Sequence, residues 1–128
     1  MQDRPTADEL LEALAEFLRD RSNQEPDRFL RFQFLVASNS LAILRREWES
    51  EEQFLEAEWA GLSALLGPAG RPGSFRELRR EVGERNARLC DLIAEGKFDD
   101  NDGEATLLAH FWETTTNKVR IATPGALE

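Results

Sequence analysis

Length, composition and charge confine the chain to a few classes of protein. It has 128 residues, of which 41% are hydrophobic and 32% charged, and its formal net charge is -9. These values fit one folded domain with a single core and exclude a disordered chain. Nucleic acid and anionic membranes are disfavoured as partners, because a protein needs a basic face to bind either of them.

The N-terminus and the apolar runs indicate where the protein resides. The start, MQDRPTADEL, has no apolar stretch behind a basic segment, which argues against a secretory signal. No apolar run approaches the ~20 residues of a transmembrane helix. Cys90 has no second cysteine with which to form an internal disulfide, and this suits a reducing compartment. We therefore expect a soluble, cytoplasmic protein with no membrane contact.

Two helices are expected in the first part of the chain. Thr6 and Glu9 form a capping-box pattern before apolar residues at helical spacing, which predicts a helix over residues 6–19. A polar stretch that ends in Pro26 predicts a loop. The next helix, about 27–49, carries two apolar stripes, so we expect it to contact neighbours on both sides and to be central in the fold.

Three further helices are expected in the rest of the chain. The capping pattern recurs at Ser50 with Gln53 and at Ser74 with Glu77. The predicted helices span residues 50–66, 74–96 and 103–122, and no strand pattern occurs. The expected fold is therefore all-α: a single domain over residues 1–128, built as a mostly antiparallel bundle of about five helices.

An acidic loop precedes the last predicted helix. Aligning Gly103 with the glycine of a calcium-binding loop puts Phe98 and Ala109 at the first and last ligand positions, which excludes that site. Asp100 or Asp102 is instead expected to cap the helix, where a carboxylate also suits the helix dipole.

The chain is poor in the side chains that catalysis and metal binding require. It has one histidine and one cysteine, whereas zinc sites use three or four such ligands. Cys90 borders an apolar stripe, where a free cysteine usually packs as a small hydrophobe, and His110 has no evident nucleophile or metal ligand beside it. A pairing of the two stays open, because only the fold sets their distance. We predict no catalytic, cofactor or metal site and a role that is not enzymatic.

A few residues are candidates for contact with another protein. Trp48 and Trp59 fit the apolar stripes of their helices, so we expect both in the core, whereas Trp112 lies off the main stripe and is an interface candidate. Asn39 interrupts an apolar stripe, and it either fixes the register of helix packing or faces another chain.

Three segments carry a resemblance to a known family: RPTADELLEALAEFL, FLVASNSLAILRREWE and LLAHFWETTTNKVRIATP. Together they resemble small bacterial all-helical proteins of unknown function that are found with aminoglycoside-phosphotransferase-like kinases and acyl-CoA dehydrogenases. The best-understood of these is the small accessory subunit of the levulinate-pathway kinase for a 4-hydroxyacyl-CoA. The resemblance implies that the large partner holds the nucleotide and the catalytic residues. Its polar positions fall here on Asn39, Arg46, Glu47, His110 and Lys118.

The chain is therefore expected to be a non-catalytic accessory subunit that supports such a kinase, acting on a hydroxyacyl-CoA or a related small molecule. The alternative is a self-associating helical interaction protein, and so a homo-oligomer. The expected partner interface consists of Asn39, Arg46, Glu47, His110, Trp112 and Lys118.

Overall fold

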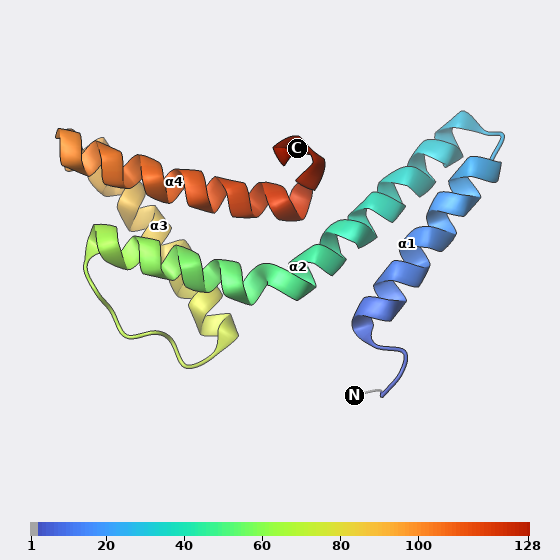
Figure 1. The fold of residues 1–128 in the computed structure, drawn as a ribbon, viewed down its shortest axis with the longest axis horizontal. Coiled ribbons are helices and arrows are strands. Elements are labelled where there is room, and N and C mark those ends of the chain that lie inside the picture. Colours follow the sequence, from blue (N-terminus) through green and yellow to red (C-terminus); the bar gives the residue numbers. More distant parts are fainter. Residues whose placement is uncertain (1–2) are drawn as a thin grey trace. The chain divides into compact units, whose positions relative to one another are not determined.

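The structure, a computed structural model, describes residues 3–128. Over this range every regular element is a helix, which confirms the all-α prediction. The elements are α1 (Ala7–Gln24), α2 (Arg28–Leu66), α3 (Phe75–Ala94), α4 (Asn101–Ala122) and a short 3-10 helix, η1 (Pro124–Leu127), as shown in Figure 1. None of the helices within 3–128 combines the length and the apolar character that crossing a membrane requires.

The largest difference from the prediction is in α2. The segments 27–49 and 50–66 form one helix, so the described residues contain four α-helices rather than about five. Reading Ser50 with Gln53 as a helix start was wrong, because the surrounding RREWESEEQFLEAEW has strong helix formers and no glycine or proline. An ion pair between Arg45 and Glu49, one turn apart at 3.6 Å, lies just before Ser50 and supports continuity.

Other helix ends agree with the capping patterns. Thr6 and Ser74 each begin a helix as a complete capping box, and Asp100 accepts a hydrogen bond from the amide of Gly103 at the start of α4. α1 runs to Gln24 instead of the predicted residue 19, because its polar end contains no helix breaker before Pro26.

The described chain divides into two compact units, with the boundary between Ser50 and Glu51 inside α2. We call residues 3–50 the hairpin unit and residues 51–128 the core unit. In the hairpin unit, α1 lies antiparallel to the first half of α2 (Figure 1). Its buried residues are small: Ala15, Ser22 and Ser38. The two helices can therefore approach closely, but they enclose no large apolar side chain.

The core unit holds the hydrophobic core. Its buried cluster contains Trp59, Leu62, Leu78, Val82 and Leu89, from the second half of α2 and from α3. The core position expected for Trp59 is thus confirmed.

The helices of the core unit run in different directions along α2. Arg79 contacts Glu51 and Asn86 contacts Glu58, so α3 runs in the same direction as α2 where they touch. α4 runs antiparallel to α2 (Figure 1), with Lys118 near Glu58. The expectation of mostly antiparallel neighbours therefore fails for α3, because the loop at 67–74 carries the chain back to the beginning of the α2 segment it packs on.

Candidate partner interface

The two helices of the hairpin unit touch along one line. Ser38 donates a hydrogen bond from Oγ to the Ala15 carbonyl at 2.7 Å, and Ser22 donates one to the Arg31 carbonyl at 3.2 Å. A salt bridge between Arg45 and Asp8 is the third contact along this line. Each helix thus contributes residues spaced by seven, nearly two helical turns, so each set lies in a row on one side of its helix.

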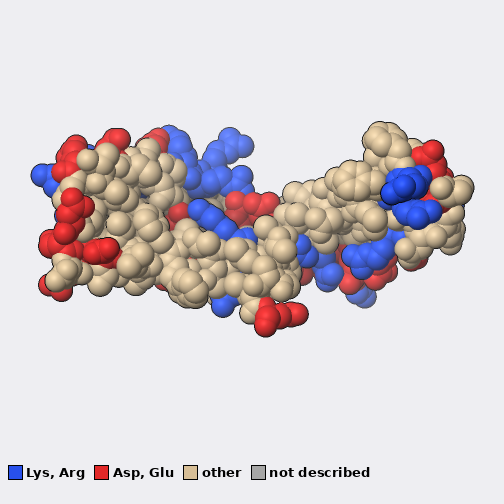
Figure 2. Space-filling model, turned by 90° about the horizontal axis from the view of Figure 1, so that it is seen from above, with Lys and Arg blue, Asp and Glu red and all other residues tan. Residues whose placement is uncertain are grey.

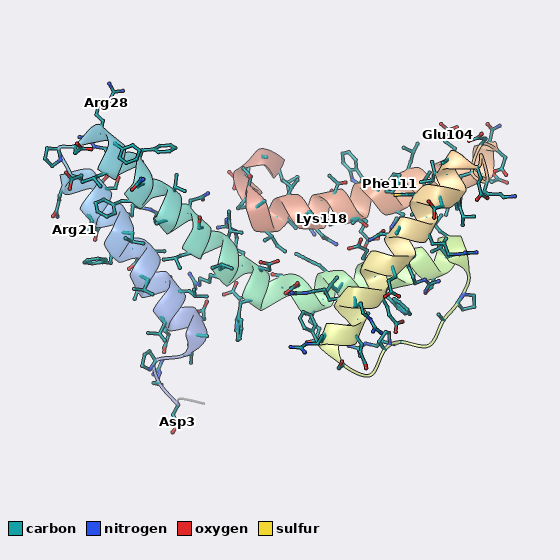
Figure 3. The ribbon with its side chains drawn as sticks, turned by 180° about the vertical axis from the view of Figure 1, so that it is seen from behind. Asp3, Arg21, Arg28, Glu104, Phe111 and Lys118 are labelled. Atoms are coloured by element: carbon teal, nitrogen blue, oxygen red, sulfur yellow. The ribbon has the colours of Figure 1, made fainter. Side chains whose placement is uncertain are left out.

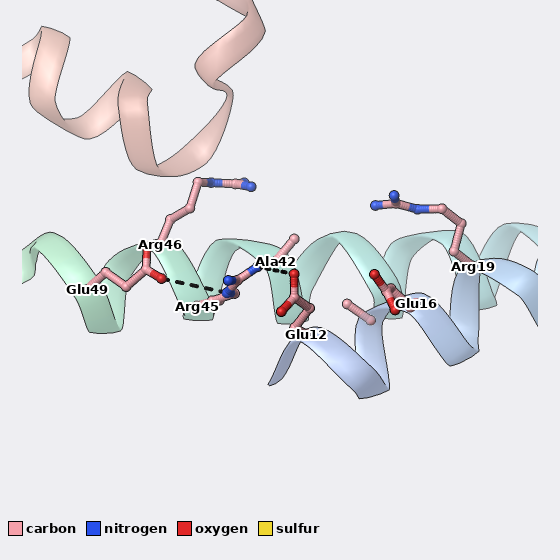
Figure 4. Close-up of a pocket in the computed structure, with 8 residues that line it drawn as sticks. Glu12, Glu16, Arg19, Ala42, Arg45, Arg46 and Glu49 are labelled. Carbon is pink, nitrogen blue, oxygen red and sulfur yellow. Dashed lines mark hydrogen bonds and ion pairs between the residues drawn. The ribbon is translucent and has the colours of Figure 1, made fainter. Parts of the chain in front are cut away.

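A charged groove lies on one side of this contact line. Its volume is about 280 Å³, and Figure 4 shows the side chains that line it. The lining residues are Glu12, Ala15, Glu16, Arg19, Ala42, Arg45, Arg46 and Glu49. Residues of both helices line this groove. The surface of α1 that carries Glu12 and the surface of α2 that carries Arg46 therefore lie on the same side of the hairpin unit.

Arg45 is held by acids of its own chain. Besides Asp8, its guanidinium donates a hydrogen bond to Glu12 at 2.9 Å. The pKa of Asp8 is below its ordinary value chiefly because Arg45 donates hydrogen bonds to it, and the same contact raises the pKa of Arg45. Since the central arginine is already paired, the groove offers little unneutralised positive charge to an anionic ligand.

The opposite side of the hairpin unit is apolar. Helical spacing places a stripe from each helix there, across the contact line from the groove residues. We call this surface the hairpin face. It consists of Leu10, Leu11, Leu14, Phe17 and Leu18 from α1 and Leu30, Phe34, Ala37, Leu41, Leu44 and Trp48 from α2.

Trp48 was expected in the core, and that prediction was wrong. Its side chain is 72% exposed, on the same stripe as Leu41 and Leu44. The periodicity correctly groups these residues on one side of α2, but no neighbouring helix of the hairpin unit covers that side.

α2 carries a second apolar stripe, here called the outer stripe. It contains Phe29, Phe32, Val36 and Ile43, and Asn39 lies among them. Asn39 is exposed, so it does not fix packing within the fold; the buried polar residue at this level of α2 is Ser38. No charged residue occurs over 32–44, and Figure 2 shows a broad tan, uncharged surface on this unit.

The predicted interface residues fall into two groups. Asn39, Arg46 and Glu47 lie on α2 in the hairpin unit. The others, His110, Trp112 and Lys118, lie on α4 in the core unit. Within α4 they differ in exposure: Trp112 is 79% exposed, whereas His110 is buried.

His110 and Lys118 lie near Glu58, a buried acid of α2. Glu58 accepts a hydrogen bond from the side-chain amide of Asn86 at 2.7 Å, and Lys118 Nζ lies 3.8 Å from the same carboxylate. Figure 3 shows Lys118 on the side of α4 that faces α2, whereas Phe111 points away. This polar cluster ties α2, α3 and α4 together.

Burial favours the neutral form of His110. Desolvation lowers its pKa from the ordinary 6.5, and the nearby Glu58 and Glu113 carboxylates only partly oppose that effect. The imidazole packs directly against the backbone of Gly61, where a Cβ would fall 2.2 Å from Nδ1. Its surroundings are those of a packed histidine.

Cys90 is a free, exposed residue of α3. It does not pack as the small hydrophobe that the sequence suggests. Cys90 is exposed, whereas His110 on α4 is buried. Across residues 3–128, no three side chains among His, Cys, Asp and Glu are grouped so as to hold a metal ion.

Sequence reasoning missed the hairpin face as an interface candidate. Leu10, Leu14, Phe17 and Leu44 belong to apolar stripes, and helical spacing alone does not show whether such a stripe is buried or left exposed. The sequence feature that could have identified this face is the absence of charged residues over 32–44. A helical segment with no charged side is usually covered by other parts of a protein.

Comparison with known proteins gives a family and no function. The family model described as "Domain of unknown function (DUF6285)" matches residues 24–126, which run from the end of α1 into η1. No curated protein and no solved structure gives a match.

Proposed function

We propose that this chain, which belongs to the DUF6285 family, is a non-catalytic accessory subunit. The family description assigns no function, so the proposal is supported by the exposed apolar surfaces of the chain and by the sequence resemblance given above. The chain binds and supports an aminoglycoside-phosphotransferase-like kinase that acts on a hydroxyacyl-CoA or a related small molecule. The kinase supplies the nucleotide site and the chemistry, and both proteins work in the cytoplasm.

The observation that carries this proposal is the outer stripe of α2. Phe29, Phe32 and Val36 are exposed large apolar residues, and the predicted interface residues Asn39 and Glu47 share their side of the helix. An apolar strip with a polar margin is the usual composition of a protein interface. Trp112, exposed on α4, is the kind of aromatic anchor that contributes strongly to binding.

The surroundings of the two most reactive side chains also favour a binding role. His110 is buried where α4 packs against Gly61, and Cys90 is an exposed thiol on the surface of α3. A catalytic base needs access to a substrate, so the buried position of His110 suits packing better than turnover.

The test is co-expression of the chain with the phosphotransferase-like kinase of the same genome. We expect the two proteins to co-purify in a fixed ratio. We also expect the complex to transfer phosphate from ATP to a hydroxyacyl-CoA faster, or for longer, than the kinase alone. Val36→Glu places a charge in the outer stripe and should weaken the complex at least about tenfold.

The matched control is Leu44→Glu, which makes the same change on the hairpin face. The exposed fractions of Leu44 and Val36 are 51% and 48%, so the two variants differ in position rather than in burial. Kinase binding that survives Val36→Glu, or a kinase that neither binds nor responds to the chain, would contradict the proposal.

The second candidate function is self-association without a kinase. It is favoured by the hairpin face, which is an apolar surface distinct from the outer stripe. Purification from the native host separates the two functions: a stoichiometric kinase supports the first, whereas the chain alone in an oligomer supports the second.

A further inference from the structure

We propose that the hairpin face is covered by the hairpin face of a second copy of this chain. The two hairpin units form a four-helix bundle with two-fold symmetry, in which the α1/α2 loops lie at opposite ends. This pairing uses a different surface from the proposed kinase contact, so either one can exist without the other.

The first argument is that the hairpin unit has no core of its own. The buried hydrophobic cluster belongs to the core unit, and Ala15 is the one apolar residue among the buried residues described in the hairpin unit. Two helices that touch through small residues bury too little apolar surface to offset the entropy of ordering about fifty residues. A second layer of helices over the hairpin face supplies the missing burial.

The second argument is the area available. Leu10, Leu14, Phe17, Leu30, Leu44 and Trp48 are all exposed on the hairpin face. With the partly buried residues between them, they present roughly 800 Å² per copy, which is what each partner buries in a stable interface of standard size. Two-fold pairing is the commonest form of self-association, since one patch then serves both copies.

The third argument is the distribution of charge along the hairpin unit, which favours one relative orientation of the two copies. The loop end of the hairpin unit, residues 17–33, holds four arginines and three acids, a net charge of +1. The open end, residues 3–16 and 41–50, holds three arginines and seven acids, a net charge of -4. Figure 3 shows Arg21 and Arg28 at the loop end and Asp3 at the other.

A pairing with both loops at one end would place the two acidic ends together, and like charges repel. A two-fold axis perpendicular to the helices instead places each loop end beside the open end of the other copy. In that arrangement α2 crosses its own copy near Ala37, and Leu30 faces Leu44 of the second copy, since 30, 37 and 44 are evenly spaced on one stripe.

The oligomeric state of the full chain tests the proposal directly. In the absence of any kinase, light scattering should give twice the chain mass of 14.6 kDa. Leu44→Glu should produce a monomer with lower helical content, because its hairpin unit loses the cover of the second copy, whereas Val36→Glu should stay dimeric and fully helical. Arg21→Glu with Arg28→Glu, at the exposed loop end, should weaken the dimer about tenfold at low salt, unlike the control Arg76→Glu on α3.

Cross-linking tests the arrangement. In a Cys90→Ser background, a chain with Leu30→Cys mixed with one carrying Leu44→Cys should form the mixed disulfide dimer under mild oxidation. Ala37→Cys should link to its own copy. Like-with-like disulfides at positions 30 and 44 would overturn the arrangement, because they require both loops at one end.

Three results overturn the pairing itself: a monomeric wild type, a dimer unaffected by Leu44→Glu, or a dimer dissolved equally by Val36→Glu. A kinase complex that forms with the Leu44→Glu monomer leaves the proposed function intact. Conversely, a dimer that binds no kinase contradicts the proposed function but supports the pairing. The two proposals can therefore be refuted independently.

Discussion

Gly61 is the residue of α2 against which His110 of α4 packs. A Cβ at this position would meet Nδ1 of His110 at 2.2 Å and Cε1 at 2.9 Å, distances that real side chains do not adopt. The absence of a side chain at Gly61 is therefore what lets the buried imidazole lie directly against the helix.

Gly61→Ala should consequently destabilise the protein although alanine is the better helix former. We expect a loss of about 1 to 3 kcal/mol from overpacking, measured by urea unfolding at fixed protein concentration. Gly83→Ala is the matched control, since nothing lies within 4 Å of a Cβ there, and it should gain about 0.5 to 1 kcal/mol.

A double variant identifies the cause. If His110 is the obstacle, Gly61→Ala combined with His110→Ala should cost less than the two single losses added together. Simple additivity would show that the alanine at 61 acts through some other contact.

The lowered pKa of His110 makes stability depend on pH in one direction. The unfolded chain, with an ordinary pKa of 6.5, takes up a proton more readily than the folded protein. This contribution to stability is complete above about pH 6.5 and falls as the pH drops through that value toward the folded pKa. The charged groups that face the imidazole, Glu58, Glu113 and Lys118, do not reverse the direction.

We therefore expect wild type to lose more unfolding free energy between about pH 7.5 and about pH 5.5 than His110→Gln, which cannot take up the proton. Urea unfolding at the two pH values measures this difference. Equal losses in the two proteins would show that His110 titrates normally in the folded state.

At the residue scale, sequence reasoning predicted local chemistry better than burial. The capping roles of Thr6, Ser74 and Asp100 could be predicted because each involves partners only three residues away. The burial of Ser38 and the exposure of Trp48 could not, since helical spacing shows which residues share a side but not what lies against it.

Among the elements, α2 provides the clearest comparison between a real cap and an apparent one. Ser50 lies inside the helix Arg28–Leu66, whereas Ser74 begins α3 and accepts a hydrogen bond from the Glu77 amide at 3.2 Å. The two serines have the same local sequence pattern but occupy different positions in their helices.

Alanine at the two positions should have opposite effects on thermal stability. Ser74→Ala removes a cap and should cost about 1 kcal/mol. Ser50→Ala should be neutral or stabilise by up to ~0.5 kcal/mol, because alanine is the better residue in a helix interior. A comparable loss at Ser50 would indicate that α2 is broken there.

At the element scale, the existence of helices was predictable and their number was not. Apolar periodicity located all four helices, but continuity through Ser50 depends on the absence of any breaker, which a capping pattern can obscure. The direction of α3 relative to α2 depends on the path of the loop over residues 67–74, for which the sequence offers no periodic signal.

For the molecule as a whole, the two units should differ in how their stability responds to concentration. The core unit encloses its own apolar cluster, whereas the hairpin unit gains its cover from the proposed second copy. Mass action then makes the hairpin unit more stable at higher protein concentration, with little effect on the core unit.

Hydrogen exchange can measure this difference. Amide protection in α1 should rise as the concentration increases from about 1 to about 100 μM, whereas protection in α3 should stay constant. Protection of α1 that is independent of concentration would place its cover within a single chain.

The order of the two units along the chain has a consequence for biosynthesis. The hairpin unit precedes the core unit, so a ribosome produces the uncharged stretch 32–44 and both apolar stripes before the cluster around Leu62 and Leu78 can form. The nascent chain therefore exposes its most aggregation-prone segment before the core unit can fold. Co-translational supply of the partner, or slower synthesis at low temperature, should raise the soluble yield of the protein.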